Sequence, residues 1–485
     1  MKKIFIHQNQ TKKALIINQE KTILEVLRNY AYVITANCGG MGQCKKCLVE
    51  VNGSKVLACQ TKIEDNMNIY LENKQDLITP ENLAKNESYL VLDIGTTTLV
   101  CCLIDKETKQ VLKQIARLNP QIMYGADIIT RIKQVKDGHL IPMQNIIIQE
   151  INSLIKSLLE NHKPQRLIIA GNTTMIHLVM GIDPSQIGKY PYQAQFLTSL
   201  SFKGDKLNLQ ADEVLIPPHI GAFLGSDVVL SCLAINLLEQ EKPSLFVDFG
   251  TNGEMVLKVG DNIWATSTAV GPAFEGTNIE KGMAGIKGAI YSVDYDGKLN
   301  FKVIDNEALG ICGSGLIDII SILIKEGLLD KSGKLINNQK SSLSKNLIKQ
   351  TFYITDNVYI TQKDIRQFQL AKSAILTGIE ILLKKASLKK TELKNVYISG
   401  GFGSHINIKS AITCGLIPKT FFKKTTIINN ACILGGILLA LDSSLLAKGN
   451  LLAKKTVVVD LNKEKKFNNY FIRNLTFNNA EEKLQ

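Results

Sequence analysis

Two segments of the chain follow the same plan, and this repeat constrains the fold more than any other feature. Residues 90–100 (LVLDIGTTTLV) and residues 245–257 (LFVDFGTNGEMVL) each run from an apolar stretch through an aspartate and a Gly-Thr turn into a second apolar stretch. One such segment is an ordinary hairpin. Two copies, about a third of the chain apart, predict an internal duplication in which two similar loops face one ligand.

The turns in both segments have the chemistry of a phosphate-binding loop. Predicted strands at 89–93 and 99–105 flank the first turn, and predicted strands at 244–249 and 254–259 flank the second. Successive backbone N–H groups and hydroxyls in Gly-Thr turns can donate hydrogen bonds to phosphate oxygens. The first strand of each pair ends in an aspartate, which can hold Mg²⁺ through water because Mg²⁺ keeps most of its hydration shell.

A third glycine-rich segment lies nearer the C-terminus. Residues 395–405 (NVYISGGFGSH) predict a strand, a tight turn and a helix. Gly400, Gly401 and Gly403 allow the backbone to approach a flat or phosphorylated ligand closely. The three segments, in this order, resemble the ATPase superfamily that contains sugar kinases, acetate kinase, heat-shock chaperones and actin.

That resemblance implies a role for each segment. In the superfamily the first two loops bind the phosphates of ATP and the third loop borders the adenosine. By resemblance, Asp93 and Asp248 position Mg²⁺, and Glu254 is the candidate for orienting the attacking water. The residues that the resemblance places at the nucleotide are Gly95, Thr96, Thr97, Thr98, Gly250, Thr251 and Asn252 at the phosphates, and Gly400, Gly401, Phe402, Gly403 and Ser404 at the adenosine.

Four of the ten cysteines lie close together near the N-terminus, at Cys38, Cys44, Cys47 and Cys59. Their spacing is C-x5-C-x2-C-x11-C, and three glycines after the first cysteine let the loop turn tightly. Four thiolates clustered in this way hold a 2Fe-2S cluster in ferredoxins. The alternative is a structural zinc site, which usually uses two separate C-x2-C pairs, and only Cys44 and Cys47 form such a pair. The pattern therefore favours the iron–sulfur cluster.

The residues before the cysteines support the same interpretation. Alternating residues at 3–7 and 13–17 predict a hairpin, and Thr22 followed by Glu25 forms a capping box that opens a helix. This hairpin, helix and cysteine loop resemble the ferredoxin-like 2Fe-2S domains of the β-grasp fold. The other six cysteines fall in apolar segments and are predicted to be small buried side chains.

The chain has a formal net charge of +13, which raises the question of nucleic-acid binding. Lysine supplies 51 of the 57 basic residues and arginine only 6, although arginine is the usual reader of phosphates and base edges. We therefore expect no nucleic-acid partner, whereas a positive surface favours an acidic protein partner.

A membrane partner is not expected either. No apolar run approaches the ~18 residues that a membrane span needs, and the first ten residues lack the apolar stretch of a signal peptide. We expect a cytoplasmic protein.

These features predict a multidomain chain of mixed α/β and α+β class, with an N-terminal β-grasp ferredoxin-like domain followed by a duplicated actin-like ATPase body. A polar stretch around Pro80 predicts a linker, or a loop that lies on the following domain. The predicted boundaries are 1–72 for the ferredoxin-like domain, 73–88 for the linker, 89–243 for the first ATPase half, 244–450 for the second half with the adenosine loop, and 451–485 for a C-terminal tail.

Seven short motifs together are more specific than any one of them. Behind the 2Fe-2S domain, VLDIGTTTLV, AGNTTM, PPHIGAFLGSDV, VDFGTNGE, GPAFEG, GICGSGLID and ISGGFGSHIN resemble the reductive activators of corrinoid proteins, which are iron–sulfur ATPases. The resemblance extends from about residue 3 to residue 441. Longer members of that family carry a middle domain before the first phosphate loop. We expect this chain to lack it, because residue 88 leads directly into that loop.

The resemblance also implies a function. Such proteins use ATP to return an inactive Co(II) corrinoid, bound in the corrinoid protein of a methyltransferase system, to Co(I). It implies a 2Fe-2S cluster, ATP and Mg²⁺ as cofactors, an upstream low-potential electron donor, and a homodimer formed through the large domain. Two alternatives stay open: a small-molecule kinase with a redox-sensing iron–sulfur domain, and a redox adaptor without catalysis. The four cysteines beside a complete ATPase favour the activator.

Overall fold

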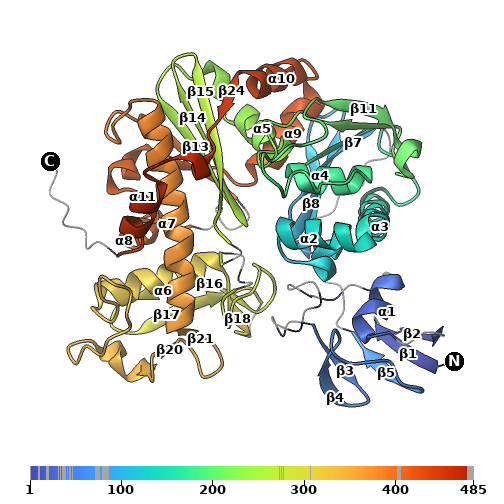
Figure 1. Ribbon diagram of the computed structural model, residues 1–485, viewed down its shortest axis with the longest axis horizontal. Coiled ribbons are helices and arrows are strands. Elements are labelled where there is room, and N and C mark those ends of the chain that lie inside the picture. The colour runs from blue at the N-terminus through green and yellow to red at the C-terminus, as the bar shows by residue number, and fades with distance from the viewer. Residues whose placement is uncertain are drawn as a thin grey trace. The chain divides into compact units, whose positions relative to one another are not determined.

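The computed structural model shows two compact units (Figure 1). The first contains residues 1–230 and 436–450, and the second contains residues 231–435 and 451–485. The residues that the structure describes are 2–8, 11–17, 21–30, 32, 34, 36, 40, 42, 45, 47–71, 77–78, 87–271, 273–274, 276, 278–305, 307–400 and 406–477.

The first unit begins with a five-stranded sheet in the order β2-β1-β5-β3-β4 and one helix, α1. The bounds are β1 Lys2–Gln8, β2 Thr11–Ile17, α1 Ile23–Asn29, β3 Leu48–Val51, β4 Ser54–Leu57 and β5 Asn68–Tyr70. Strand β1 pairs with β2 as the predicted hairpin and with β5 in parallel, the mixed pairing of a β-grasp domain. Alternation along β1 buries Ile4 and Ile6 in one core with Leu27 of α1. The predicted capping box is confirmed, since Thr22 and Glu25 exchange both hydrogen bonds.

The rest of the first unit is built on a seven-stranded sheet in the order β11-β12-β10-β7-β8-β9-β6. Strands β7, β8 and β9 form an antiparallel meander, and β10 and β12 continue in parallel on the other side of β7. The bounds are β6 Leu77–Ile78, β7 Ser88–Ile94, β8 Thr98–Asp105, β9 Val111–Leu118, α2 Ile128–Gln134, α3 Leu140–Leu159, β10 Arg166–Gly171, α4 Thr173–Met180, β11 Leu200–Lys203, β12 Glu213–Ile216 and α5 Ser226–Ala234.

The sequence explains the central position of β7. Leu90, Val91, Leu92 and Ile94 are all fully buried, and a continuous apolar run of this kind is typical of a strand covered on both faces. Part of the predicted linker lies on the same sheet, because β6 pairs with β9 at its edge. The linker residues 73–76 and 79–86 lie outside the described residues.

The second unit is built on a six-stranded sheet in the order β23-β22-β13-β14-β15-β24. Helix α7 packs against β14 and β15, where Gly378 leaves room for the Met255 side chain. The C-terminal segment joins the same sheet, because β24 pairs with β15. The bounds are β13 Ser244–Phe249, β14 Asn252–Val259, β15 Asn262–Ala269, α7 Gln362–Lys385, β22 Asn395–Ser399, α8 Ile408–Thr413, β23 Thr425–Ile427, β24 Thr456–Val458 and α11 Phe467–Asn474. Helices α9 Ala431–Leu441 and α10 Leu445–Lys455 are divided between the two units, because residues 436–450 belong to the first.

Two three-stranded sheets, β17-β16-β18 and β19-β20-β21, and one further helix, α6, also belong to the second unit. Helix α6 packs against β16 and α8. The bounds are β16 Ala289–Tyr295, β17 Leu299–Val303, β18 Gly310–Ile311, α6 Gly313–Lys325, β19 Leu347–Ile348, β20 Thr351–Tyr353 and β21 Tyr359–Thr361.

The two large sheets share one strand plan, which confirms the predicted duplication. In each, a three-stranded antiparallel meander is continued on its first strand by two parallel strands: β10 and β12 beside β7, and β22 and β23 beside β13. Asp93 and Asp248 therefore end equivalent strands.

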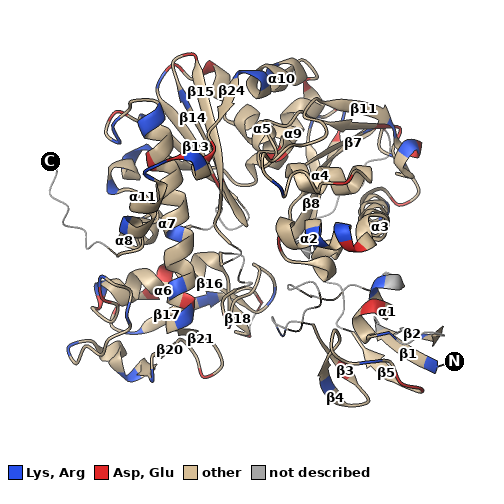
Figure 2. Ribbon diagram, viewed as in Figure 1, with Lys and Arg blue, Asp and Glu red and all other residues tan. Residues whose placement is uncertain are grey.

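Basic side chains are spread along both units rather than gathered on one element (Figure 2). Within the part of the chain that the structure describes, no helix is both long and apolar enough to cross a membrane.

Candidate functional site

The first hairpin, residues 93–98, joins β7 to β8. Ile94 and Leu99 are the last paired residues, so the loop between them has four residues. The N–H of Gly95 donates to the carbonyl oxygen of Thr98 over 3.0 Å and closes the loop. The predicted phosphate contacts Gly95, Thr96, Thr97 and Thr98 thus lie together at the end of β7, beside Asp93.

Three carbonyl oxygens of the first hairpin accept hydrogen bonds from outside the loop. The side-chain Nδ2 of Asn119 donates to Gly95 over 2.8 Å, and its backbone N–H donates to Thr97 over 2.8 Å. Arg131, which is fully buried, donates through Nη2 to Thr96. The carbonyl and N–H of a trans peptide point in opposite directions. These bonds therefore turn three successive N–H groups away from the support, as an anion-binding loop requires.

The second hairpin, residues 248–252, joins β13 to β14. Phe249 and Gly253 are its last paired residues, so its loop has three residues, one fewer than the first. The N–H of Gly250 donates to the carbonyl oxygen of Asn252 over 3.0 Å. The predicted phosphate contacts Gly250, Thr251 and Asn252 lie together at the end of β13, beside Asp248.

Asp248 and Glu254 lie directly opposite each other on β13 and β14. Opposed residues place their side chains on one face of the sheet, with Cβ atoms about 4.5–5.5 Å apart, and like charges in such positions destabilise it. Glu254 is buried and Asp248 half-buried, so a cation between the two carboxylates would offset their repulsion. These oxygen donors fit Mg²⁺. At the equivalent position of the first hairpin, Asp93 lies opposite Val100.

The third predicted segment meets the second hairpin at Gly400. In the parallel pairing of β22 with β13, Ser399 lies beside Asp248. Gly400 has a φ of +116°, and a Cβ there would lie 2.1 Å from the carbonyl oxygen of Phe249, so only glycine fits. The other predicted adenosine contacts, Gly401, Phe402, Gly403 and Ser404, lie outside the described residues and stay predictions.

The first unit contains an equivalent contact that the sequence interpretation did not use. Gly171 ends β10 beside Ile94, and a Cβ there would lie 2.6 Å from the carbonyl oxygen of Ile94. Gly171 is followed by Asn172, whose side chain caps α4 by accepting the N–H of Thr174 over 3.0 Å. A glycine turn directly after a buried strand, as in the third segment, is the signal that could have identified this site.

Three buried polar atoms near the end of β10 have no hydrogen-bond partner among the described residues. They are Nδ2 of Asn172, Oγ1 of Thr174 and Nε2 of His219. Thr173 Oγ1 lies 3.4 Å from Nδ1 of His219, so these groups belong to one neighbourhood. Buried polar groups in proteins are nearly always paired. The neighbourhood therefore has the chemistry of a site that a ligand or ordered water completes.

Asp227 adds a carboxylate near the end of β10. The N–H of Gly171 donates to Oγ of Ser226 over 3.1 Å, which fixes the start of α5 against β10. Burial raises the pKa of Asp227 to about 6, although a hydrogen bond from the N–H of Val228 opposes the shift. A carboxyl group whose pKa is moved so far toward neutrality is typical of a functional site. No role was predicted for it from the sequence.

Two of the four predicted cluster ligands, Cys47 and Cys59, lie among the described residues. Cys47 directly precedes β3 and Cys59 follows β4. Both side chains are buried, and their Sγ atoms are 3.3 Å apart. Nε2 of Gln60 donates to Sγ of Cys59 over 3.6 Å. Converging thiols that accept a hydrogen bond are the donor set of an iron–sulfur site.

The loop before Cys47 also fits a cluster. Gly40 and Gly42 have φ values of +107° and +75°, which only glycine adopts readily. Cys38 and Cys44 lie outside the described residues, so their ligation stays a prediction. Within the described residues no group of three or more potential metal ligands occurs, as expected when two of four cysteines fall outside them.

Comparison with protein families assigns all three parts of the chain. The profile of a 2Fe-2S iron–sulfur cluster binding domain matches residues 18–74. The RACo middle region matches residues 89–240, and the C-terminal domain of RACo, the ASKHA domain, matches residues 242–485. This middle region contains the first phosphate hairpin and is the first half of the ATPase body. It is therefore not the additional domain that longer members carry before that hairpin, and the expectation that this chain lacks that domain stays a prediction.

Individual relatives agree with the family profiles. The corrinoid activation enzyme RamQ of Eubacterium limosum is 28% identical over 578 aligned residues, covering 95% of this chain and 97% of the relative. A [Co(II) methylated amine-specific corrinoid protein] reductase of Methanosarcina barkeri is 26% identical over 429 residues, covering 80% of this chain and 76% of the relative.

A solved structure shows the same fold. It is a reductive activator for corrinoid, iron-sulfur protein, similar with a TM-score of 0.76 and 24% identity over 99% of each chain. The predicted fold class, a ferredoxin-like domain followed by a duplicated actin-like ATPase body, is confirmed. With family profiles matched from residue 18 to residue 485, the chain belongs to the RACo family of reductive activators of corrinoid proteins.

Proposed function

We propose that this chain is an ATP-dependent reductive activator that returns the inactive Co(II) corrinoid of a methyltransferase-system corrinoid protein to Co(I). The observation that carries this proposal is the presence, in one chain, of a ferredoxin-like domain with converging thiols and an ASKHA body with two phosphate hairpins. Two relatives that match most of the chain are named for corrinoid activation and for reduction of a Co(II) corrinoid protein, which supports the same function.

The two hairpins are assigned to the phosphates of ATP. The N–H groups of residues 96–98 point away from the Asn119–Arg131 support and bind phosphate oxygens. Asp93 and Asp248 hold Mg²⁺ through its water ligands. Glu254 lies on the same sheet face as Asp248 and orients the water that attacks the terminal phosphate. Gly400 and the residues after it border the adenosine.

The unpartnered polar atoms near β10 complete this assignment. Asn172 and Thr174 follow a glycine that contacts the first hairpin, so their free donors reach toward the same nucleotide. Asp227, whose pKa burial raises to about 6, adds a carboxyl group at this end of the sheet.

Cys38, Cys44, Cys47 and Cys59 are assigned to a 2Fe-2S cluster, which supplies one-electron chemistry when bound. The chain itself buries two of these thiols and donates a hydrogen bond from Gln60 to Cys59. Hydrogen bonds to ligand sulfur are one of the factors that set a cluster's reduction potential.

ATP is needed because Co(I) formation is uphill for ordinary one-electron donors. A nucleotide can drive this step only if the nucleotide-bound and nucleotide-free states bind the partner's conformers with different affinities. We therefore infer that hydrolysis changes how the chain holds the corrinoid protein, and that the terminal phosphate is transferred to water.

The remaining partners follow from this function. An upstream low-potential donor reloads the cluster, and two copies of the chain form a homodimer through the large domain. Six of the cysteines that the structure describes are free thiols, which fits a reducing compartment such as the cytoplasm; they are Cys59, Cys101, Cys102, Cys232, Cys312 and Cys414. The spread of lysines over both units favours an acidic protein partner over nucleic acid.

The test is anaerobic reconstitution of the cluster, followed by mixing with a Co(II) corrinoid protein, Mg-ATP and a reductant. We expect Co(I) absorbance to appear only when all components are present. Cys47→Ser is expected to abolish Co(I) formation and keep nucleotide binding. Cys414→Ser is the matched control, since this buried thiol donates to Ile317 and serine can make the same bond. Full reduction by Cys47→Ser would refute the electron route.

The same assay separates the alternatives. A small-molecule kinase would produce a phosphorylated compound whether or not the cluster is reduced. A redox adaptor would hydrolyse no ATP with any corrinoid protein. Either result, without Co(I), would replace the proposed function.

A further inference from the structure

Two of the chain's six arginines bind the same short segment, residues 119–131, although lysine is far commoner in this protein. Arginine has a planar guanidinium with five donors, whereas lysine has a single charged point. One of the two, Arg131, lies within the segment and contacts the first hairpin. The other, Arg28, belongs to helix α1 of the ferredoxin-like domain. The segment therefore contacts the phosphate loop through its first and last residues and the redox domain through its middle.

At the first hairpin, the segment sets the direction of the loop peptides. Asn119 binds the carbonyl oxygens of Gly95 and Thr97 at 2.8 Å each, and Arg131 binds that of Thr96. Phosphate bound to the loop N–H groups would polarise the same peptides and strengthen these bonds. Occupancy of the loop and the position of the segment are thus linked.

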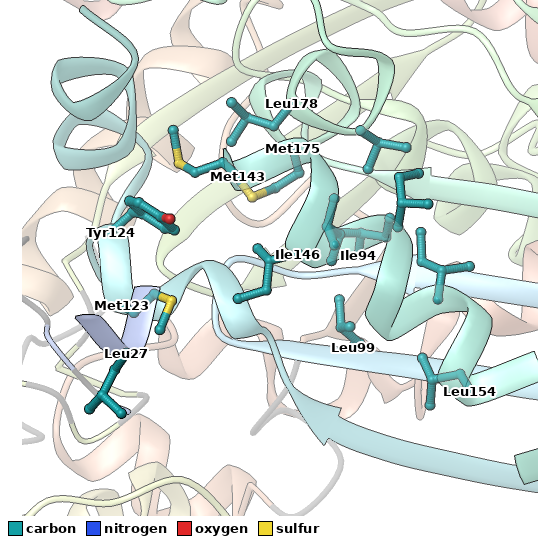
Figure 3. Packing of buried hydrophobic residues seen from close by; sticks show 14 of the residues in the cluster. Leu27, Ile94, Leu99, Met123, Tyr124, Met143, Ile146, Leu154, Met175 and Leu178 are labelled. Carbon is teal, nitrogen blue, oxygen red and sulfur yellow. The ribbon is translucent and has the colours of Figure 1, made fainter. Parts of the chain in front are cut away.

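In its middle, the segment binds helix α1. Nε of Arg28 donates to the carbonyl oxygen of Met123 over 3.1 Å, and its Nη2 donates to the same oxygen. The guanidinium carbon lies 4.7 Å from the ring centroid of Tyr124. Leu27 of α1 lies beside Met123 in the same buried cluster (Figure 3). Two hydrogen bonds from a charged guanidinium to one carbonyl oxygen, a ring contact and an apolar contact together hold the helix here.

The residues that join these two contacts are held in place by packing and hydrogen bonds. All five residues of the short 3-10 helix η1, Pro120–Tyr124, are buried. The Asn119 side chain caps this helix by accepting the N–H of Gln121, and Gln121 donates to the carbonyl oxygen of Met143 in α3 over 3.0 Å. Arg131 also donates to the carbonyl oxygen of Gly125 over 2.9 Å. A closely packed element moves as one piece, so a shift at the hairpin contact also moves the contact with α1.

We propose that residues 119–131 form a relay between the nucleotide and the ferredoxin-like domain. The relay couples nucleotide binding at the first hairpin to docking of that domain on the segment through Arg28. Asn119 and Arg131 are positioning residues for the phosphate loop, and Arg28 is the contact that transmits their position to α1. The inference rests on the proposed binding of nucleotide at this hairpin. Linkage is reciprocal. If bound nucleotide strengthens docking of the domain by a given factor, docking of the domain strengthens nucleotide binding by the same factor.

Hydrogen exchange on the full-length, cluster-loaded protein tests the relay directly. Adding Mg-ADP to the wild type is expected to slow amide exchange in residues 119–125 and also in α1. In Arg28→Ala the nucleotide-dependent change in α1 is expected to disappear, while that in 119–125 persists. Arg166→Ala is the matched control, because Arg166 makes an ion pair with Glu213 and lies over the Tyr89 ring, away from the hairpin.

Nucleotide affinity gives the second readout. Arg28→Ala is expected to weaken Mg-ADP binding about 5-fold, the lower end of typical coupling between sites. Asn119→Ala is expected to weaken it more, since Asn119 touches the loop. In the double variant Arg28→Ala/Asn119→Ala, the loss of Mg-ADP affinity should be little larger than in Asn119→Ala alone. Arg131 is fully buried and its loss risks unfolding, so the two ends of the relay are tested instead.

The outcomes separate this inference from the proposed function. The relay would be overturned if Mg-ADP did not change amide exchange in α1 of the wild type. It would also be overturned if Arg28→Ala and Arg166→Ala showed the same nucleotide-dependent exchange in α1 and the same affinity for Mg-ADP. Calorimetry that detects no Mg-ADP binding to any of these proteins would overturn the proposed function, and the relay with it.

Discussion

The two phosphate hairpins share a strand plan and differ in their surroundings. The first has a four-residue loop whose carbonyl oxygens accept hydrogen bonds from Asn119 and Arg131. The second has a three-residue loop, with Glu254 opposite its aspartate and Gly400 packed against its backbone. The two copies thus keep the same strand order and differ in the contacts around each turn. We infer that the two hairpins have different tasks.

The difference indicates which task each hairpin performs. Paired carboxylates on one sheet face suit a metal ion and an attacking water, so we propose that the second hairpin carries out hydrolysis. A loop whose peptides are held by a buried arginine suits the fixed positioning of phosphate, so we propose that the first hairpin reports whether nucleotide is bound. Substitutions that affect one hairpin and spare the other can break or sharpen this division.

The largest expected effect belongs to Glu254. Glu254→Gln keeps the side-chain shape but cannot act as a base, so ATP hydrolysis is expected to fall about 10²–10⁴-fold while nucleotide binding persists. Phosphate release in the presence of a Co(II) corrinoid protein is the measurement. Glu213→Gln, which removes a carboxylate paired with Arg166 on β12, should hydrolyse ATP at nearly the wild-type rate. Equal rates for the two variants would remove the water-orienting role from the second hairpin.

The next largest expected effect is a loss of stability when a glycine beside the second hairpin is replaced. Gly400→Ala combines a φ of +116° with a Cβ 2.1 Å from a backbone oxygen, and is expected to cost about 3 kcal/mol or more of unfolding free energy. Gly260→Ala, at a φ of +55° with open space around it, should cost about 1 kcal/mol. Scanning calorimetry compares them. If Gly400→Ala is no worse than Gly260→Ala, the close contact with the second hairpin is not rigid.

Much of this architecture could be predicted because it depends on local spacing. The two hairpins and the α1 capping box each occupy a few consecutive residues, where apolar runs and turn residues are informative. The cysteine spacing likewise indicated an iron–sulfur domain, which the family match confirms.

The support of the first hairpin could not be predicted in the same way. Asn119 and Arg131 bind loop carbonyls 24 and 35 residues away in sequence, and one chain gives no sign of such pairing. Asp227 was missed because its pKa depends on burial, which only the packed structure shows.

A pH-dependent effect distinguishes the two halves further. In both units the first residue of a helix is tied to the end of a strand, but in opposite directions: the N–H of Ala431 in α9 donates to Oγ of Ser399 over 3.1 Å, whereas Oγ of Ser226 in α5 accepts the N–H of Gly171. The next residue is Cys432 in α9 and Asp227 in α5. Only the first half therefore has a carboxyl group there, with its pKa raised to about 6 by burial.

The sign of that effect follows from proton binding. Between about pH 4 and pH 6 the folded protein holds a proton on Asp227 that the unfolded chain has released, so stability falls as the pH rises. The expected loss is on the order of 1–3 kcal/mol. Asp227→Asn removes the titration, so its melting temperature should rise relative to wild type between pH 4.5 and pH 7.5, without nucleotide. A constant difference across this range would show that Asp227 titrates normally.

The smallest effect concerns His139 and has the opposite sign. Its ring lies 5.5 Å from that of Tyr124, and burial, with a smaller contribution from the charge on Arg28, lowers its pKa. Below about pH 6.5 the unfolded chain therefore takes up a proton that the folded protein resists, so stability falls as the pH falls.

His139→Gln tests whether this titration acts on the support of the first hairpin. The ring is half-exposed, so solvent screening should keep the stability change below about 0.5 kcal/mol. The more specific readout is the relay: at pH 5.5 the wild type should lose part of the Mg-ADP protection of α1, because a charged imidazole near Arg28 repels it, while His139→Gln retains it. Nothing comparable is expected at the second hairpin, where exchange in β13 and β14 should respond to Mg-ADP equally at pH 5.5 and pH 7.5. If both hairpins lost protection together, the titration would act on nucleotide binding itself, and the first hairpin would not be the separate reporter that its buried support suggests.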